Sequence, residues 1–178
     1  MHSLLGSLAS RLGSTLWRRL WRHVWVTDRD LRRTFPSSML ESITAAIAHG
    51  ETQHGGELRL VIEADLDLAA VWRGQTPRQR AIALFAEWHV WDTAANNGIL
   101  LYVQLADRAV EVVADRGFAG RVSPAEWELV CAGMRTAFAA GRFEAGALAG
   151  IQQASALLAR HFPPGVVHNE LPDRPLIL

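Results

Sequence analysis

The chain has 178 residues, with 18 Arg balanced by 18 Asp plus Glu, one Cys and no Lys. This length favours a single domain with a sizeable core, and a composition of 49% hydrophobic and 20% charged residues is typical of globular proteins. The absence of Lys excludes Walker phosphate loops, protein kinases, Schiff-base enzymes and Ser-x-x-Lys acylases, and the single Cys131 excludes internal disulfides and cysteine-rich zinc sites.

The net charge of zero gives no reason to expect a nucleic-acid partner, but it hides two opposite halves. Residues 1–35 hold seven Arg and two Asp, a net charge of +5, whereas residues 36–178 have a net charge of −5. Arginine interrupts the apolar start of the chain, and no run approaches the ~20 apolar residues of a membrane span. We therefore expect a cytoplasmic protein, with peripheral attachment to the inner membrane as an option.

Residues 11–25 (RLGSTLWRRLWRHVW) are predicted to form an amphipathic helix. Its apolar arc contains Leu16, Trp17, Leu20, Trp21, Val24 and Trp25, and its basic side contains Arg11, Arg18, Arg19 and Arg22. Arg and Trp together are typical of helices that bind a membrane surface, so this segment is a candidate site for a membrane or a protein partner. The alternative is a helix packed on its own domain, with the Trp side chains in the core and the Arg side chains in solvent.

The rest of the chain alternates between helical and strand periodicity. The pattern predicts a helix near 40–49, a strand at 57–63, a helix at 76–91, strands at 99–105 and 109–114, and helices at 123–140 and 142–161. Trp88 and Trp91 are assigned to the core, as is Cys131. The Pro-rich residues 164–178 are predicted to be an extended tail rather than an element.

This order predicts an α/β fold: a three-layer α/β/α sandwich with a small mixed sheet of at least three strands. The first two strands are joined through a helix, so they should be parallel, and the third should pair with the second as an antiparallel hairpin. Loops 54–57, 92–98 and 115–117 should then meet at one end of the sheet.

Five segments in register resemble the TPM domain family: HGGELR at 54–59, NNGIL at 96–100, DR at 107–108, DRG at 115–117, and GRF at 141–143 with Gly146 and Gly150. RRTFP and NELPDRP near the two ends resemble a compact bacterial subgroup. The resemblance divides the chain into a basic amino-terminal helix (1–35), the TPM-like domain (36–163) and the tail (164–178). It implies an α/β/α fold, phosphatase activity and, in some members, binding of divalent cations, mainly calcium.

The family offers no agreed set of catalytic residues to carry across. Many members have a signal peptide and a carboxy-terminal membrane span, and this chain is expected to have neither, which argues against an extracytoplasmic role.

The converging loops carry the candidate site. The candidate metal ligands are Asp92, Asn97, Asp115 and Glu57, whose hard oxygens suit Ca²⁺ or Mg²⁺. Arg116 is the candidate phosphate-binding residue, because its planar guanidinium matches phosphate oxygens, and His54 is the candidate for acid–base chemistry. Each residue taken alone is also explained by turn formation.

Asp65 and Asp67 follow an apolar strand, as in phosphatases with an aspartyl nucleophile. Those enzymes need a basic residue that is usually Lys, so a solvated acidic loop is the preferred interpretation. The sequence thus predicts a TPM-like domain that binds a divalent cation at a loop rim, with weak phosphatase activity. The alternative is a non-enzymatic adaptor at a membrane or on a protein partner; the substrate and oligomeric state are not predicted.

Overall fold

A computed structural model describes residues 15–165 and 169–178. After a helix over residues 15–25, the elements are α2 (Asp28–Thr34), α3 (Ser37–Glu51), β1 (Glu57–Glu63), α4 (Leu68–Trp72), α5 (Pro77–Glu87), β2 (Gly98–Gln104), β3 (Ala109–Ala114), the 3-10 turn η1 (Arg116–Phe118), α6 (Pro124–Ala139), α7 (Phe143–His161) and β4 (Leu176–Ile177). None of the helices among these residues is long and apolar enough to span a bilayer.

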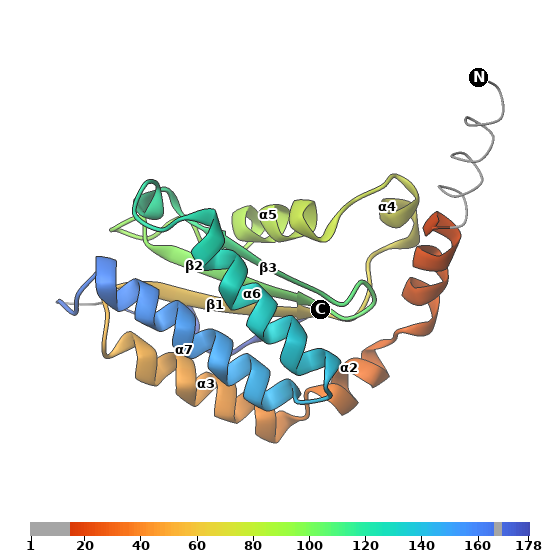
Figure 1. Cartoon of the computed structure of the whole chain (residues 1–178), viewed down its shortest axis with the longest axis horizontal. Coiled ribbons are helices and arrows are strands. Elements are labelled where there is room, and N and C mark those ends of the chain that lie inside the picture. The colour runs from red at the N-terminus through yellow and green to blue at the C-terminus, as the bar shows by residue number, and fades with distance from the viewer. Residues whose placement is uncertain (1–14, 166–168) are drawn as a thin grey trace.

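The strands form one mixed sheet in the order β3-β2-β1-β4 (Figure 1). β1 pairs in parallel with β2, with Leu58 opposite Ile99, and β2 pairs antiparallel with β3, with Ile99 opposite Ala114. These strands form because β1 and β2 are nearly continuous apolar runs that are buried along their whole length. The predicted parallel pair and hairpin are both confirmed.

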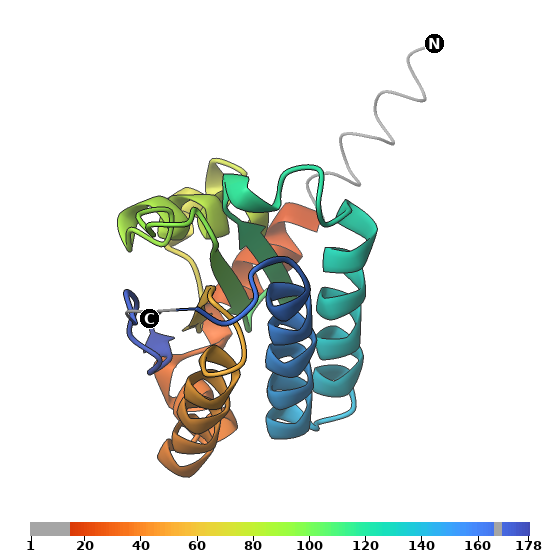
Figure 2. The ribbon, with the colours of Figure 1, turned by 90° about the vertical axis from the view of Figure 1, so that its left-hand side faces the viewer.

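Helices cover both faces of the sheet, which confirms the predicted three-layer α/β/α sandwich. α3, α6 and α7 lie on one face and α5 on the other (Figure 2). Successive residues of a strand point to opposite faces. Leu58 and Leu60 therefore belong to the larger core beneath α3, α6 and α7, whereas Val61 packs in the smaller core with Leu84 of α5.

The carboxy-terminal tail differs from the prediction. It contains a strand, β4, which pairs in parallel with Val61 and Ile62 of β1. This pairing satisfies backbone groups at an edge of β1 that would otherwise be open. Arg59 also donates to the carbonyl oxygens of Pro172 and Arg174, so the segment after residue 168 is held along β1. The positions 166–168 of the predicted tail lie outside the described residues.

Trp88 and Trp91 are not in the core: they are 38% and 48% exposed. The predicted helix ends at Glu87 rather than at residue 91, and His89 has a φ of +53°. This turn breaks the 3.6-residue periodicity on which the assignment of both Trp side chains to the core depended. Cys131 is buried, as predicted.

The helix over residues 15–25 packs on the domain, as the second interpretation of this segment expects, but its Trp side chains are not in the core. Its Arg19 and His23 face the protein, and Trp17, Trp21 and Trp25 are exposed. Residues 11–14 of the predicted helix lie outside the described residues. Periodicity separates an apolar side from a basic side, but it does not say which of them meets the protein.

Candidate functional site

The three predicted loops converge at one end of the sheet, which we call the rim: residues 54–57, 92–98 and 115–117. Backbone hydrogen bonds join them directly. The amide of Glu57 donates to Asn97 O (3.4 Å), and the amide of Asp115 donates to Gly98 O (3.0 Å). The amide of Gly117 donates to Asn96 O (2.9 Å). Because adjacent strands lie ~4.8 Å apart, the strand ends at Glu57, Asn97 and Asp115 are immediate neighbours.

Glycine makes this close approach possible. A Cβ atom on Gly98 would lie 1.9 Å from the carbonyl oxygen of Val90, and one on Gly117 would lie 2.3 Å from that of Asn96. In both cases the obstacle is backbone, which cannot move aside as a flexible side chain would. The rim therefore depends on these two glycines, which belong to the NNGIL and DRG segments.

Asn97 and Asp115 each present a buried oxygen atom that has no hydrogen-bond partner among the described residues: Asn97 Oδ1 and Asp115 Oδ2. The other half of each side chain is engaged. Asn97 Nδ2 donates to Gly55 O, and Asp115 Oδ1 accepts from the Arg116 amide (2.6 Å). Leaving a buried polar atom unpaired costs ~1–3 kcal/mol, so two such oxygens at adjacent strand ends call for a functional explanation.

The other two predicted metal ligands have different surroundings. Glu57 is buried, and its Oε2 accepts from the Leu171 amide (3.1 Å); burial raises the pKa of this carboxyl. Asp92 is exposed in the loop before β2. Within residues 15–165 and 169–178, no three His, Cys, Asp or Glu side chains are placed to hold one metal ion. An ion at the rim would therefore rely on fewer carboxylates, amide or carbonyl oxygens, and water.

Arg116 and His54 also lie at the rim. Arg116 is exposed, and its Nε donates to Asn96 Oδ1 (2.7 Å), which ties one nitrogen of the guanidinium to the neighbouring loop. His54 is fully buried, with Nδ1 3.0 Å from Gly56 O. Burial lowers the pKa of this imidazole, so its neutral form is favoured. Of the two, Arg116 is the one placed to meet a soluble phosphate.

An acidic cavity of about 420 Å³ opens beside the rim, and the sequence analysis missed it. It is lined in part by Glu51, Glu57 and Asp173. Glu51 Oε1 accepts from the Leu58 amide (3.1 Å), and Glu51 Oε2 is buried with no hydrogen-bond partner in the described residues. Glu51 stands three residues before the HGGELR segment, but nothing in its local pattern distinguishes it from an exposed residue at a helix end.

At the opposite end of the sheet a buried acid is fully satisfied. Glu63 accepts from the hydroxyl of Tyr102 and pairs with Arg80, whose Nη2 lies 2.6 Å from Glu63 Oε1. Asp65 and Asp67 also lie at that end, as expected. Asp67 caps α4 by accepting from the Ala70 amide (3.1 Å), which is the role of a residue in an acidic loop.

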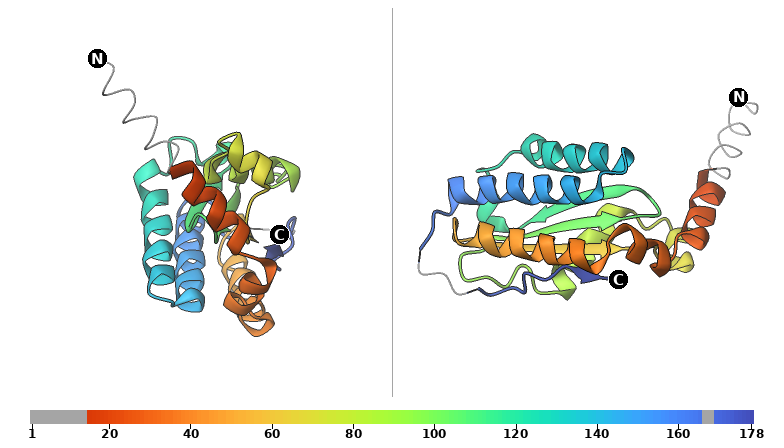
Figure 3. Two further views of the ribbon diagram at one scale, coloured as in Figure 1. Left: turned by 90° about the vertical axis from the view of Figure 1, so that its right-hand side faces the viewer. Right: turned by 90° about the horizontal axis from the view of Figure 1, so that it is seen from below.

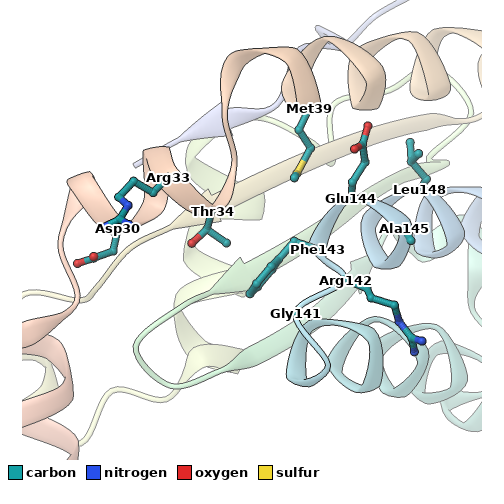
Figure 4. Close-up of a pocket in the computed structure, with 10 residues that line it drawn as sticks. All are labelled: Asp30, Arg33, Thr34, Met39, Gly141, Arg142, Phe143, Glu144, Ala145 and Leu148. Carbon is teal, nitrogen blue, oxygen red and sulfur yellow. The ribbon is translucent and has the colours of Figure 1, made fainter.

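The largest cavity described, about 920 Å³, is not at the rim. It lies where α2 and the start of α3 approach the turn between α6 and α7 (Figure 4). Its charged residues, Asp30, Arg33, Arg142 and Glu144, are all exposed. Since it holds no buried unpaired polar atom, we give the rim precedence as the candidate site.

The fold and the rim together define a small α/β/α domain with three polar loops that meet at one end of a mixed sheet. The family model of the TPM domain matches residues 29–157, so the chain belongs to the TPM domain family. No curated protein matches the chain.

Two solved structures share the fold. The BA42 protein of the psychrophilic bacterium Bizionia argentinensis is 26% identical, with a TM-score of 0.67 over 80% of this chain and 94% of that one. The N-terminal domain of a protein from P. gingivalis is 19% identical, with a TM-score of 0.57 over 74% of this chain and 82% of that domain.

Proposed function

We propose that the rim binds a divalent cation, Ca²⁺ or Mg²⁺, and that a phosphate ester binds beside this ion and is slowly hydrolysed by water. The observation that supports this most directly is the pair of buried, unpaired oxygens on Asn97 and Asp115 at adjacent strand ends. Both are hard oxygen donors, which these cations prefer. Asp92 and Glu57 remain predicted ligands of the same ion.

The small number of carboxylates suits a weakly held ion. Mg²⁺ usually keeps several of its waters and binds through one or two carboxylates together with substrate phosphate, rather than in a cage made only of protein. Asp115 supplies such a carboxylate at the rim, and its position is fixed by the Arg116 amide. This explains how the rim can serve a cation without three acidic side chains around it.

Arg116 follows Asp115 directly and would hold the phosphate group. Its Nε is tied to Asn96, so the guanidinium is oriented before the phosphate arrives, and its outer nitrogens can donate to phosphate oxygens. A cation at Asp115 would supply neutralisation of the charge on the phosphate oxygens. His54 has no part in this proposal, because its ring is buried beneath the rim.

The first test is the melting temperature with 10 mM CaCl₂ or MgCl₂. For a dissociation constant of ~10⁻⁴–10⁻³ M, binding should raise the melting temperature of the wild type by about 3–10 °C. Asp115→Asn should remove this shift, because Asn can still cap η1 but lacks the charge. The matched control is Asp67→Asn, which alters a capping Asp at the other end of the sheet and should keep the full shift. An equal shift in both variants, or none in the wild type, would refute the cation site.

The second test is hydrolysis of p-nitrophenyl phosphate. Arg116→Gln removes the charged fork and should lower the rate about tenfold or more while leaving the cation-induced thermal shift in place. Activity that survives both Arg116→Gln and Asp115→Asn unchanged would come from a contaminating enzyme, and the phosphatase part of the proposal would then fall.

A further inference from the structure

The helix over residues 15–25 presents its aromatic side to solvent. Trp17 and Trp21 are each 58% exposed and Trp25 is 73% exposed, whereas the one buried residue of this helix is His23. Figure 3 shows the helix lying across the end of the molecule that is opposite the rim. Large aromatic side chains gain most from leaving water, so a folded protein that exposes several of them together points to something that covers them.

A polar clamp holds the helix in this orientation. Arg19 donates to both carboxylate oxygens of Asp107, with Nε to Oδ1 at 3.0 Å and Nη2 to Oδ2 at 2.7 Å, and its Nη2 also donates to Gln75 O. Arg22 Nη2 lies 3.3 Å from Asp107 Oδ1. His23 Nδ1 accepts from the Leu66 amide (2.9 Å), and its Nε2 lies 3.3 Å from Asp107 Oδ2. Because Arg19, Arg22 and His23 are held against the domain, the three Trp side chains of this helix point outward.

The exposed surface extends onto α4. The rings of Trp17 and Trp72 meet edge to face, with centroids 6.2 Å apart, and Trp72 is itself 60% exposed. Leu68, on the same short helix, is exposed as well. We call this surface the aromatic patch; it consists of Trp17, Trp21, Val24, Trp25, Leu68 and Trp72.

The helix that carries most of the aromatic patch is basic. Residues 15–25 contain Arg18, Arg19 and Arg22 and neither Asp nor Glu. Arg19 and Arg22 pair with Asp107, whereas Arg18 is exposed. A second copy of this chain docking through the same patch would bring two basic segments together, which disfavours a symmetric dimer. An occupant that is apolar and also carries negative charge complements the patch better.

We propose that the aromatic patch docks the protein on a membrane surface that contains anionic phospholipids. Trp rings suit the boundary between headgroups and acyl chains, because one part of the ring system is apolar and its N–H can donate to headgroup oxygens. Exposed Arg18 adds attraction to the anionic headgroups. This role is independent of the proposed rim function, since the patch and the rim lie at opposite ends of the sheet.

The test is flotation of the full chain with vesicles of phosphatidylcholine alone or of phosphatidylcholine with 30% phosphatidylglycerol. The protein should float with the anionic vesicles, and 0.5 M NaCl should weaken binding. Dibrominated acyl chains in the same vesicles should quench its Trp fluorescence. Trp21→Ala with Trp25→Ala should lower the partition coefficient about tenfold or more, because the most exposed apolar area is removed.

The matched control is Trp88→Ala with Trp91→Ala, which removes two exposed Trp side chains outside the aromatic patch and should leave flotation unchanged. Arg18→Glu supplies a variant that keeps every Trp and should still weaken binding to anionic vesicles. Absence of flotation with anionic vesicles would overturn the proposal, as would equal losses in the two double variants. Sedimentation showing that the patch variants dissolve a dimer while vesicle binding is unaltered would overturn it in favour of self-association.

Discussion

Glu51 is a carboxylic acid that the fold keeps from ionising. Burial raises its pKa, the nearby carboxylates of Glu57 and Asp173 add to this, and the hydrogen bond from the Leu58 amide is too weak to offset them; the pKa rises from 4.5 to about 8. Below pH 4.5 the acid is neutral in both the folded and the unfolded chain. As the pH rises toward 8, only the unfolded chain gains the ionised form, so the folded state loses stability over this range.

The first prediction concerns this residue. The Gln side chain of Glu51→Gln is neutral at every pH and retains an oxygen for the Leu58 amide. Position 51 should therefore contribute no pH dependence to the free energy of unfolding of this variant between pH 5 and pH 9. It should match the wild type near pH 4 and exceed it at pH 9, as measured by urea unfolding across the series. The exposed Glu41→Gln serves as the control and should keep the decline seen in the wild type. A decline that persists in Glu51→Gln would place its origin elsewhere.

The same residue shows the limit of sequence analysis for the site. Convergence of Glu57, Asn97 and Asp115 could be predicted, because parallel strands begin at the same end of a sheet. The surroundings of Glu51 could not, since they depend on Asp173, which the tail brings back from more than a hundred residues away. Which oxygen atoms remain unpaired is likewise set by the exact geometry of the loops, as for Asn97.

At the level of elements, α6 and α7 pack closely because α7 carries glycine at the contact. A Cβ atom on Gly146 would lie 2.7 Å from Ala137 Cβ and 2.8 Å from Phe138 Cε1. Gly133 of α6 is also inside a helix, but there the nearest atom would be 3.8 Å away, on Gln153. The two positions therefore separate the packing role of glycine from its poor helix propensity.

We predict opposite effects for alanine at these two sites. Gly146→Ala should destabilise the protein by about 1–2 kcal/mol, because overpacking outweighs the gain in helix propensity. Gly133→Ala should stabilise it by about 0.5–1 kcal/mol, since only the propensity changes. Urea midpoints with an unchanged m-value would measure both. Stabilisation by Gly146→Ala would mean that the helices can separate at no cost.

Elements were predictable where the pattern is strong, as in the apolar runs of β1 and β2 and the Thr76 start of α5. They were missed where a few residues decide the outcome. The end of α5 depends on the left-handed conformation at His89, and β4 on the open edge of β1. The orientation of the amino-terminal helix depends on Asp107, a distant residue in the hairpin turn between β2 and β3.

For the molecule as a whole, Asp107 joins the basic amino-terminal segment to the acidic domain. Burial alone would raise its pKa, but His23 and Arg19 outweigh that effect and lower the pKa to about 2. Because its pKa is lowered, the ionised Asp107 stabilises the docked helix at pH values above the ordinary pKa of 3.8. This stabilisation is lost as the pH falls toward 2. The zero net charge of the chain thus reflects two oppositely charged parts that meet at a partly buried ion pair.

This arrangement predicts that the amino-terminal helix opens before the domain unfolds, because its one buried side chain is polar and it adds little to the apolar core. Asp107→Asn should lower the protection of amides in residues 15–25 by roughly 2 kcal/mol in native-state hydrogen exchange. The amides of β1 and β2 should change by much less. Gly146→Ala is the contrasting case, because a defect between α6 and α7 should reduce the protection of the whole domain. Equal losses everywhere in Asp107→Asn would show instead that the helix and the domain unfold as one cooperative unit.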